Sequence, residues 1–317
     1  MVTRAAAFVL LLANAAESVT VCTLSDTFHQ VETGVIVNLL RDLGENVTTV
    51  GFPPETLPHS EVFAMFFNKT CDILPSVWLP AGHGNYVAPH TIGVDYDIVG
   101  TTSEEGTFYW AASSAAAAAG VKSLDDLVAP PPGMNTVIHV PDASTGLAIA
   151  SQTICDSLNA AGGGANFTIH ASFSDEVNFL NGAGASDLYV VGTWTPWWGV
   201  SVYEGSGQLV RLGEGTQGLG APFGLSNRGV TLAQPGALVP PALKSSSASA
   251  AAVARVFVGN KALSDMDKVV GYDKSAAALD AARAWADSEA NFGGAYWDAA
   301  LKGATPELCA ASGNQTE

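Results

Sequence analysis

The sequence predicts an α/β protein of two lobes with a helical C-terminal segment. Short apolar strands alternate with helices from residue 19 onward, and the same alternation starts again after Lys122. This alternation is typical of parallel sheets that helices cover on both faces. From about Gly224 the strand patterns give way to helical ones. We therefore expect lobe I in residues 19–104, lobe II in residues 105–224, and a mostly helical completion of lobe I in residues 225–317.

Residues 1–18 have the pattern of a secretory signal peptide. Arg4 precedes an apolar run from Ala5 to Leu12, and small residues follow where a signal peptidase would cut. The run is shorter than the roughly 20 apolar residues of a membrane-spanning helix. We expect a secreted or otherwise extracytoplasmic protein. A buried first helix and an uncleaved anchor are the alternatives.

Lobe I is expected to open with a strand, a helix and a second strand, which is the pattern of a parallel crossover unit. The helix has apolar residues at helical spacing and ends at Gly44. The expected strands cover residues 19–25, 46–52, 71–78 and 95–101, and the helix covers residues 30–44.

Lobe II repeats the same order of elements. The expected strands cover residues 136–141, 166–173 and 187–194, and the helices cover residues 146–162 and 174–184. Three further helical patterns follow within residues 245–258, 263–272 and 275–301. Trp285 and Trp297 belong to the last of these, and we expect both to be core residues of the terminal helices.

Composition and charge exclude several classes of partner. The chain has 317 residues, of which 48% are hydrophobic and 14% charged. It contains 13 Lys and Arg but 30 Asp and Glu, which gives a net charge of −17. Nucleic-acid binding needs clustered basic residues to neutralise phosphates, and this chain lacks them. A polybasic membrane anchor is excluded for the same reason.

Four cysteines fit an oxidising compartment and allow two disulfides in three connectivities. We favour Cys22 with Cys71, because both fall in or beside strands that are expected to be neighbours; free buried thiols are the alternative. Four Asn-x-Thr triplets are patterns for N-glycosylation and point to a eukaryotic secretory route. The other cysteines are Cys155 and Cys309, and the triplets begin at Asn46, Asn68, Asn166 and Asn314.

Signatures of catalysis are absent from the sequence. It contains no nucleophile elbow, no phosphate-binding glycine loop and no His-Glu-x-x-His pair. His83 and His90 lie seven residues apart, which fits neither one helix face nor a standard pair of metal ligands. We expect no enzyme activity, no metal site and no cofactor. The remaining histidines have no spacing that indicates more than packing or surface roles, and they are His29, His59, His139 and His170.

Tryptophans mark a candidate binding site. Trp78 and Trp194 each follow a short apolar strand, one in each lobe, and each precedes a proline by two residues. They therefore lie at carboxyl ends of strands, where open α/β sheets bind ligands. Aromatic faces that meet across a cleft suit a quaternary ammonium ion, which the ring quadrupole attracts. Packing in a core or interface is the alternative role.

The segment after residue 140 predicts an anion-binding helix start. Asp142, Ser144 and Thr145 are good N-cap residues, and the amides around Thr145, Gly146 and Leu147 would open the helix. Combined with an aromatic cage, this helix start predicts a site for a zwitterion.

These segments together resemble the substrate-binding proteins of glycine betaine, proline betaine and choline ABC transporters. The resemblance covers most of the mature chain. TGVIVNLLRDLG resembles the family's first helix, CDILPSVWLPAGHGNY its Trp-Leu-Pro segment, and PDASTGLAI its Asp-Pro-Gly-x-Gly-Ile turn. VVGTWTPWWGVSVYE is similar to its Gly-Trp-x-Pro-His-Trp segment, and AARAWADSEANFGGAYW to its closing helices.

The resemblance implies a periplasmic-binding-protein-like fold that closes a cleft on a small quaternary ammonium ligand, with an ABC permease as a further partner. It implies that Trp78 and Trp194 are walls of a tryptophan cage. It also implies that His83 is a partner of the ligand carboxylate, and that the amides of Gly146 and Leu147 bind the other carboxylate oxygen.

The sequence departs from the family at one cage wall. The family's third aromatic aligns with Asp26 or, after a two-residue slip, with Phe28. Phe28 would keep a weaker cage, whereas Asp26 would place a negative charge beside the cation and disfavour a ligand carboxylate. Choline would then be favoured over glycine betaine.

Three more aromatic residues are candidates for the ligand site. Trp197 stands where the family has His, as an extra wall or as packing, and Tyr109 and Trp110 lie where some members place a cage aromatic. The function that follows is an extracytoplasmic solute-binding protein for a quaternary ammonium compound or methylated zwitterion. A secreted receptor or sensor glycoprotein that kept the fold without transport is the alternative.

Overall fold

The computed structural model describes most of the chain between Ser18 and Asp287. The described residues are 18–52, 57–141, 143, 145–197, 199–223, 226–238, 249–250, 253–254, 256, 258, 260, 263, 266, 268, 270 and 278–287. The expected signal peptide, Trp297, Cys309 and Asn314 lie outside this range, as does the side chain of Trp285.

The first lobe is built on a five-stranded sheet with the order β2-β1-β3-β10-β4. β1 pairs in parallel with β2 and β3, whereas β10 runs antiparallel to both β3 and β4. The strands are β1 (Val19–Cys22), β2 (Val47–Val50), β3 (Ile73–Leu79), β4 (Asp97–Gly106) and β10 (Asn227–Ala233).

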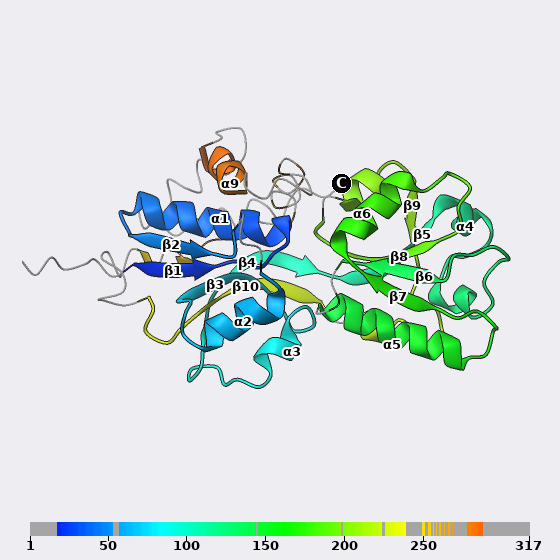
Figure 1. Cartoon of the computed structure of the whole chain (residues 1–317), viewed down its shortest axis with the longest axis horizontal. Coiled ribbons are helices and arrows are strands. Elements are labelled where there is room, and N and C mark those ends of the chain that lie inside the picture. The colour runs from blue at the N-terminus through cyan, green and yellow to red at the C-terminus, as the bar shows by residue number, and fades with distance from the viewer. Residues whose placement is uncertain are drawn as a thin grey trace, which may run out of the picture.

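Helices cover both faces of this sheet (Figure 1). On one face, α1 (Thr27–Asp42) lies between the sheet and α9 (Ala278–Asp287), and nearly all of its residues are buried. A Cβ on Gly34 of α1 would meet the Cβ of Ala282 at 3.0 Å, so a glycine permits the close approach of the two helices. The opposite face carries α2 (His59–Phe67) and α3 (Gly84–Val87).

The second lobe has a five-stranded sheet of its own, with the order β7-β6-β8-β5-β9. Helices α5 (Gly146–Ala160) and α6 (Phe173–Gly182) cover its two faces (Figure 1). The strands are β5 (Phe108–Ser113), β6 (Val137–Val140), β7 (Thr168–Ala171), β8 (Val190–Trp194) and β9 (Leu209–Arg211). The short helices are α4 (Ser114–Ala118), η1 (Leu124–Val128), η2 (Val200–Glu204) and η3 (Ala221–Phe223).

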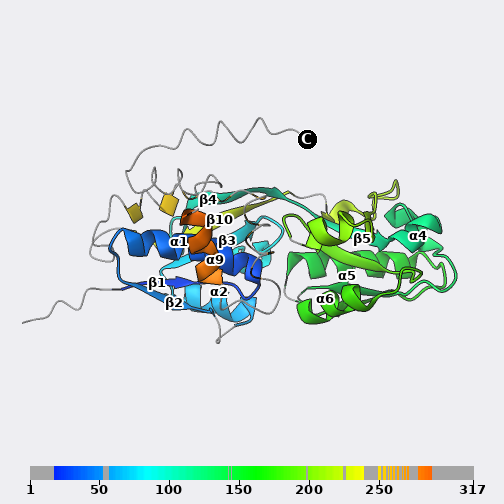
Figure 2. The same ribbon diagram turned by 90° about the horizontal axis from the view of Figure 1, so that it is seen from above.

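The two sheets lie side by side along the long axis of the molecule, and β4 runs from one toward the other (Figure 2). Because β4 ends at Gly106 and β5 begins at Phe108, a single residue, Thr107, separates strands of different sheets. The chain returns to the first sheet at Asn227, where β10 pairs with Gly106 of β4. The two crossings therefore lie next to each other.

The prediction that strands end at about Gly224 is wrong, because residues 227–233 form β10 within the first sheet. Six of its seven residues are buried, so the strand does not show the polar and apolar alternation that marks a half-exposed strand. The other strands and helices expected between residues 19 and 194 are present, with ends that shift by a few residues. Of the helices expected after residue 244, α9 covers part of the last, and most residues of the other two lie outside the described part of the chain.

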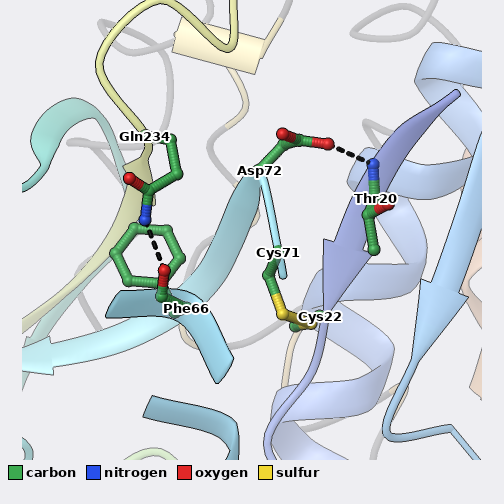
Figure 3. Close-up of a disulfide and its surroundings, with 6 residues drawn as sticks. All are labelled: Thr20, Cys22, Phe66, Cys71, Asp72 and Gln234. Carbon is green, nitrogen blue, oxygen red and sulfur yellow. Dashed lines mark hydrogen bonds between the residues drawn. A yellow bond between two sulfur atoms is a disulfide. The ribbon is translucent and has the colours of Figure 1, made fainter. Parts of the chain in front are cut away.

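A disulfide between Cys22 and Cys71 joins the end of β1 to the start of β3, as the sequence favoured (Figure 3). Beside it, the Asp72 carboxylate accepts the Thr20 amide at 2.7 Å, which fixes the register of the two strands (Figure 3). Cys155 is a buried free thiol. Within the described part of the chain, the helices are too short or too polar to cross a membrane.

Candidate functional site

A cavity lies between the two lobes and is lined by residues of both. Its walls are the start of α1, the end of β3 and the turn after it, the β4–β5 junction, the start of α5, the end of β8 and the start of β10. The first lobe contributes Asp26, Phe28, His29, Trp78, Gly82, His83, Gly106 and Asn227. The second lobe contributes Phe108, Pro141, Thr145, Leu147, Trp194 and Thr195.

Trp78 and Trp194 both line this cavity, one from each lobe, at or next to the carboxyl ends of β3 and β8. Each is followed by one residue and a cis proline, at Pro80 and Pro196. The Trp78 ring lies over Gly106, where a Cβ would approach its Cζ3 to 2.6 Å. The two matched strand ends therefore place an indole on either side of one cavity.

Both candidates for the third wall, Asp26 and Phe28, line the cavity. The Phe28 ring lies 5.3 Å from that of Trp78 at an angle of 42°, within the range of attractive aromatic pairs. Asp26, the N-cap residue of α1, adds a carboxylate to the same wall. The first lobe thus supplies two aromatic faces and one acidic group.

Glu176 of α6 is an acidic residue that the sequence reasoning missed. Its carboxyl is fully buried without a hydrogen-bond partner among the described residues. Burial raises its pKa well above the usual value, and the negative charge of Asp26 adds to this effect. The two carboxyls therefore interact across the lobe interface. The sequence does contain one indication that Glu176 is buried, because it shares a helix face with the apolar Leu180.

Thr145 and Leu147 line the cavity, but Gly146 between them does not. Its N–H donates to the carbonyl of Gly82 at 2.9 Å, which joins the two lobes. A Cβ at this position would lie 1.8 Å from the Ala81 carbonyl oxygen, so only glycine fits. The expected role of this amide in binding a carboxylate needs correction, because the amide is already satisfied by the first lobe.

The turn that carries Gly82 is held in place by Asn227. Its side-chain oxygen accepts the N–H groups of Ala81 and Gly82 at 2.8 and 2.7 Å. Thr145 caps α5 by accepting the Ala148 N–H. Both sides of the Gly82–Gly146 contact are therefore fixed by local hydrogen bonds.

Trp197 is buried and stacks on Trp194, with ring centroids 5.1 Å apart and planes at 22°. It supports the cage wall from behind and does not line the cavity.

Trp110 and Tyr109 lie in the interior of the second lobe, which corrects their expected place at the cage. The Trp110 indole N–H donates to Ser151 at 2.9 Å, and the Arg211 guanidinium lies 4.1 Å from the centre of the Tyr109 ring. Burial raises the pKa of Tyr109. The two side chains lie on opposite faces of β5, and neither lines the cavity.

Three histidines meet at the first-lobe wall, although no spacing in the sequence connects them. His29 comes from α1, His59 from α2, and His83 precedes α3; their ring centroids are 5.3–5.4 Å apart. The ligand atoms of all three lie within 4.8 Å of one another. Because nothing in the sequence brings these elements together, only the fold reveals the cluster.

The surroundings of two members of the histidine cluster, His29 and His83, favour the neutral ring. Burial, and then the neighbouring histidines, lower the pKa of His29 and His83 well below the usual value. His83 Nδ1 accepts the backbone N–H of Trp78 at 2.8 Å, which connects the cluster to the Trp78 side of the cavity. His29 Nδ1 lies 2.8 Å from Ser76 Oγ, which donates to Glu32 at 2.6 Å. Burial raises the pKa of Glu32 to about 7.

Two lobes with separate sheets and a shared aromatic cavity are the architecture of a solute-binding protein. The chain belongs to the OpuAC family, described as the substrate binding domain of the ABC-type glycine betaine transport system, whose family model matches residues 17–288. The resemblance drawn from the sequence motifs is thereby confirmed.

Solved structures show the same fold at low sequence identity. A lactococcal OpuAC in its closed conformation with glycine betaine has a TM-score of 0.69 at 15% identity, and covers 90% of this chain and 99% of its own. A choline-binding protein complexed with choline has a TM-score of 0.68 at 15% identity, covering 94% and 98%.

A glycine betaine and L-proline binding protein from Borrelia burgdorferi has a TM-score of 0.71 at 14% identity, covering 92% and 98%. None of the curated proteins compared with the chain matches it. The structural matches confirm the predicted two-lobed α/β fold.

Proposed function

We propose that this protein binds a quaternary ammonium compound between Trp78 and Trp194, and that it prefers choline to glycine betaine. The observation that carries the proposal is the shared lining of one cavity by aromatic rings of both lobes and the Asp26 carboxylate. A trimethylammonium group cannot donate a strong hydrogen bond, so ring faces and a nearby negative charge are the groups that recognise it.

Closure of the lobes strengthens this recognition. Trp78 is almost completely buried, and the cavity wall is completed by the second lobe. A cation held there loses water, and a cation–π contact then contributes about 2 kcal/mol or more. The Gly82–Gly146 hydrogen bond and the three hydrogen bonds between Thr107 and Thr195 hold the walls together.

The preference for choline follows from the charges around the cavity. A ligand carboxylate would meet the Asp26 carboxylate in the cavity lining. The helix start that would bind this carboxylate has one amide already bonded to Gly82. Choline carries the same cation without a carboxylate and avoids both penalties.

Delivery to an ABC permease and secretion through residues 1–18 are parts of the same proposal, supported by the family match. A receptor or sensor glycoprotein is the second candidate. It is favoured by the exposure of the asparagines that begin the three described glycosylation triplets, which are Asn46, Asn68 and Asn166. Mass spectrometry of the protein from its own source would show whether these sites carry glycans.

Calorimetry with choline, glycine betaine, proline betaine and dimethylsulfoniopropionate tests the ligand. We expect micromolar binding of at least one, with choline tightest. Trp194→Ala should weaken binding about 30-fold, the equivalent of one desolvated cation–π contact, and Trp194→Phe should weaken it less. Binding of none of the four compounds to the folded wild-type protein would overturn the proposal.

A further inference from the structure

We propose that His29, His59 and Asp26 form a binding site for a divalent metal ion with the ligand preferences of zinc. The three residues come from the first lobe alone, so the site does not require closure. Two imidazoles and a carboxylate are common zinc ligands. The site shares Asp26 with the ammonium site proposed above, so the two sites are tested under separate conditions.

Distances around Asp26 match the spacing of metal ligands. Zinc–nitrogen and zinc–oxygen bonds of about 2.0–2.2 Å in a tetrahedron place neighbouring ligand atoms roughly 3.2–3.6 Å apart. Asp26 Oδ2 lies 3.5 Å from His59 Nε2 and 3.8 Å from His29 Nε2. The first distance lies within this range and the second is slightly longer. Both exceed the roughly 2.7–3.2 Å of an ordinary hydrogen bond, so neither histidine nitrogen is hydrogen-bonded to Asp26.

His59 is the residue that most needs such a partner. Its ring is fully buried, and neither nitrogen has a hydrogen-bond partner among the described residues. A buried polar nitrogen without a partner is unfavourable in a folded protein. A metal ion bound to Nε2 would remove this deficit at the nitrogen that lies nearest Asp26.

His29 has the outer hydrogen bonds that orient a metal ligand. Its Nδ1 lies 2.8 Å from Ser76 Oγ, and Ser76 donates to Glu32, so Ser76 accepts the proton of Nδ1. The lone pair of Nε2 is then left on the side of Asp26. A chain from histidine through a hydroxyl to a carboxylate fixes the tautomer that a metal requires.

His83 completes the cluster without acting as a ligand. Its Nδ1 accepts the backbone N–H of Trp78 at 2.8 Å, so the proton of the neutral ring stays on Nε2. With three protein ligands, one position of a tetrahedral ion remains open. Because Asp26 and His29 line the cavity, an oxygen atom of water or of a cavity ligand can fill that position.

The test uses the full-length protein, treated with a chelator and then titrated with Co²⁺ and Zn²⁺. We expect one Co²⁺ per chain with a visible absorption band, its displacement by Zn²⁺, and an increase of Tm with Zn²⁺. Asp26→Asn and His59→Gln should each weaken Zn²⁺ binding roughly tenfold or more, on the scale of losing a metal-site partner. His83→Gln should change it much less.

His170→Gln is the matched control, because His170 pairs with Asp175 on the exposed surface of the second lobe. If Zn²⁺ binding depends on His170, or if no stoichiometric binding occurs, the proposal is wrong. The Asp26 side chain is partly exposed, so the Asp26→Asn variant is expected to fold. It therefore keeps the test valid if His59→Gln does not fold. Ammonium binding is measured with chelator present, so failure of one proposal is distinguishable from failure of the other.

Discussion

The amide of Gly146 in the second lobe donates a hydrogen bond to the carbonyl of Gly82 in the first, with an N···O distance of 2.9 Å. Both glycines lie where the backbones of the two lobes touch, and neither position has room for a side chain. A Cβ on Gly82 would lie 2.8 Å from the Trp78 carbonyl oxygen, and one on Gly146 would lie 1.8 Å from that of Ala81. A methyl group on Gly146 would therefore obstruct the approach of the two lobes, whereas one on Gly82 would disturb the turn within the first lobe.

Gly146→Ala is expected to keep the fold and impair closure. Alanine is favourable at the start of α5, but its methyl group would overlap the Ala81 carbonyl when the lobes meet. We expect at least a roughly tenfold loss of ligand affinity and a larger radius of gyration with ligand present. Gly182→Ala is the control, because a Cβ there has open space. Equal affinities of the two variants would contradict the role of this contact.

Asp26→Asn is expected to change ligand preference. Removing the negative charge should weaken choline binding and improve glycine betaine binding, because the ligand carboxylate no longer faces Asp26. Competition calorimetry in the presence of chelator gives the ratio of the two affinities. An unchanged ratio would show that Asp26 does not determine the preference.

Glu32→Gln is expected to alter the pH dependence of stability. The folded state raises the pKa of Glu32 from 4.5 to about 7, so it binds more protons than the unfolded state between these values. The wild-type free energy of unfolding should therefore fall relative to the variant by about 3 kcal/mol as pH rises from 4.5 to 7.

Urea unfolding of both proteins across this pH range measures the effect of Glu32. His29 and His83 have lowered pKa values and act with the opposite sign, since their contribution is lost as pH falls below 6.5. They are common to both proteins and cancel in the difference. Glu61→Gln, at an exposed position of α2, is the control. Parallel curves for Glu32→Gln and wild type would refute the prediction.

Reduction of the Cys22–Cys71 disulfide is expected to cost about 2–4 kcal/mol of stability, because the bond closes a loop with a sequence separation of 49. The double variant Cys22→Ser/Cys71→Ser should show the same loss without reductant. It should also show no further change when reductant is added. A reductant effect that persists in the double variant would place its cause elsewhere in the chain.

The sequence was sufficient for the features that depend on local pattern and matched motifs. Trp78 and Trp194 could be placed at strand ends because each follows an apolar run directly. Cys22 and Cys71 could be paired because the strands that carry them were expected to be neighbours. These inferences required only the order of elements in an α/β fold.

Features that depend on long-range packing could not be predicted. His29, His59 and His83 approach one another only because three separate elements end at the same wall. The hydrogen bond of Gly146 depends on how closely the lobes approach, which no local pattern encodes. Trp110 and Trp194 are both tryptophans near a strand, and only the sheet register shows that one faces the interior and the other the cavity.

The position of β10 in the first sheet has a consequence for how the chain reaches its native state. β10 lies between β3 and β4, yet it follows the whole second lobe along the chain. During synthesis, β4 therefore has no partner in its sheet until residue 227 has left the ribosome, when the second lobe is already complete. The first lobe therefore begins to be synthesised before the second lobe but completes its sheet after it. A truncation before Asn227 would leave β3 and β4 with unpaired edges that favour aggregation.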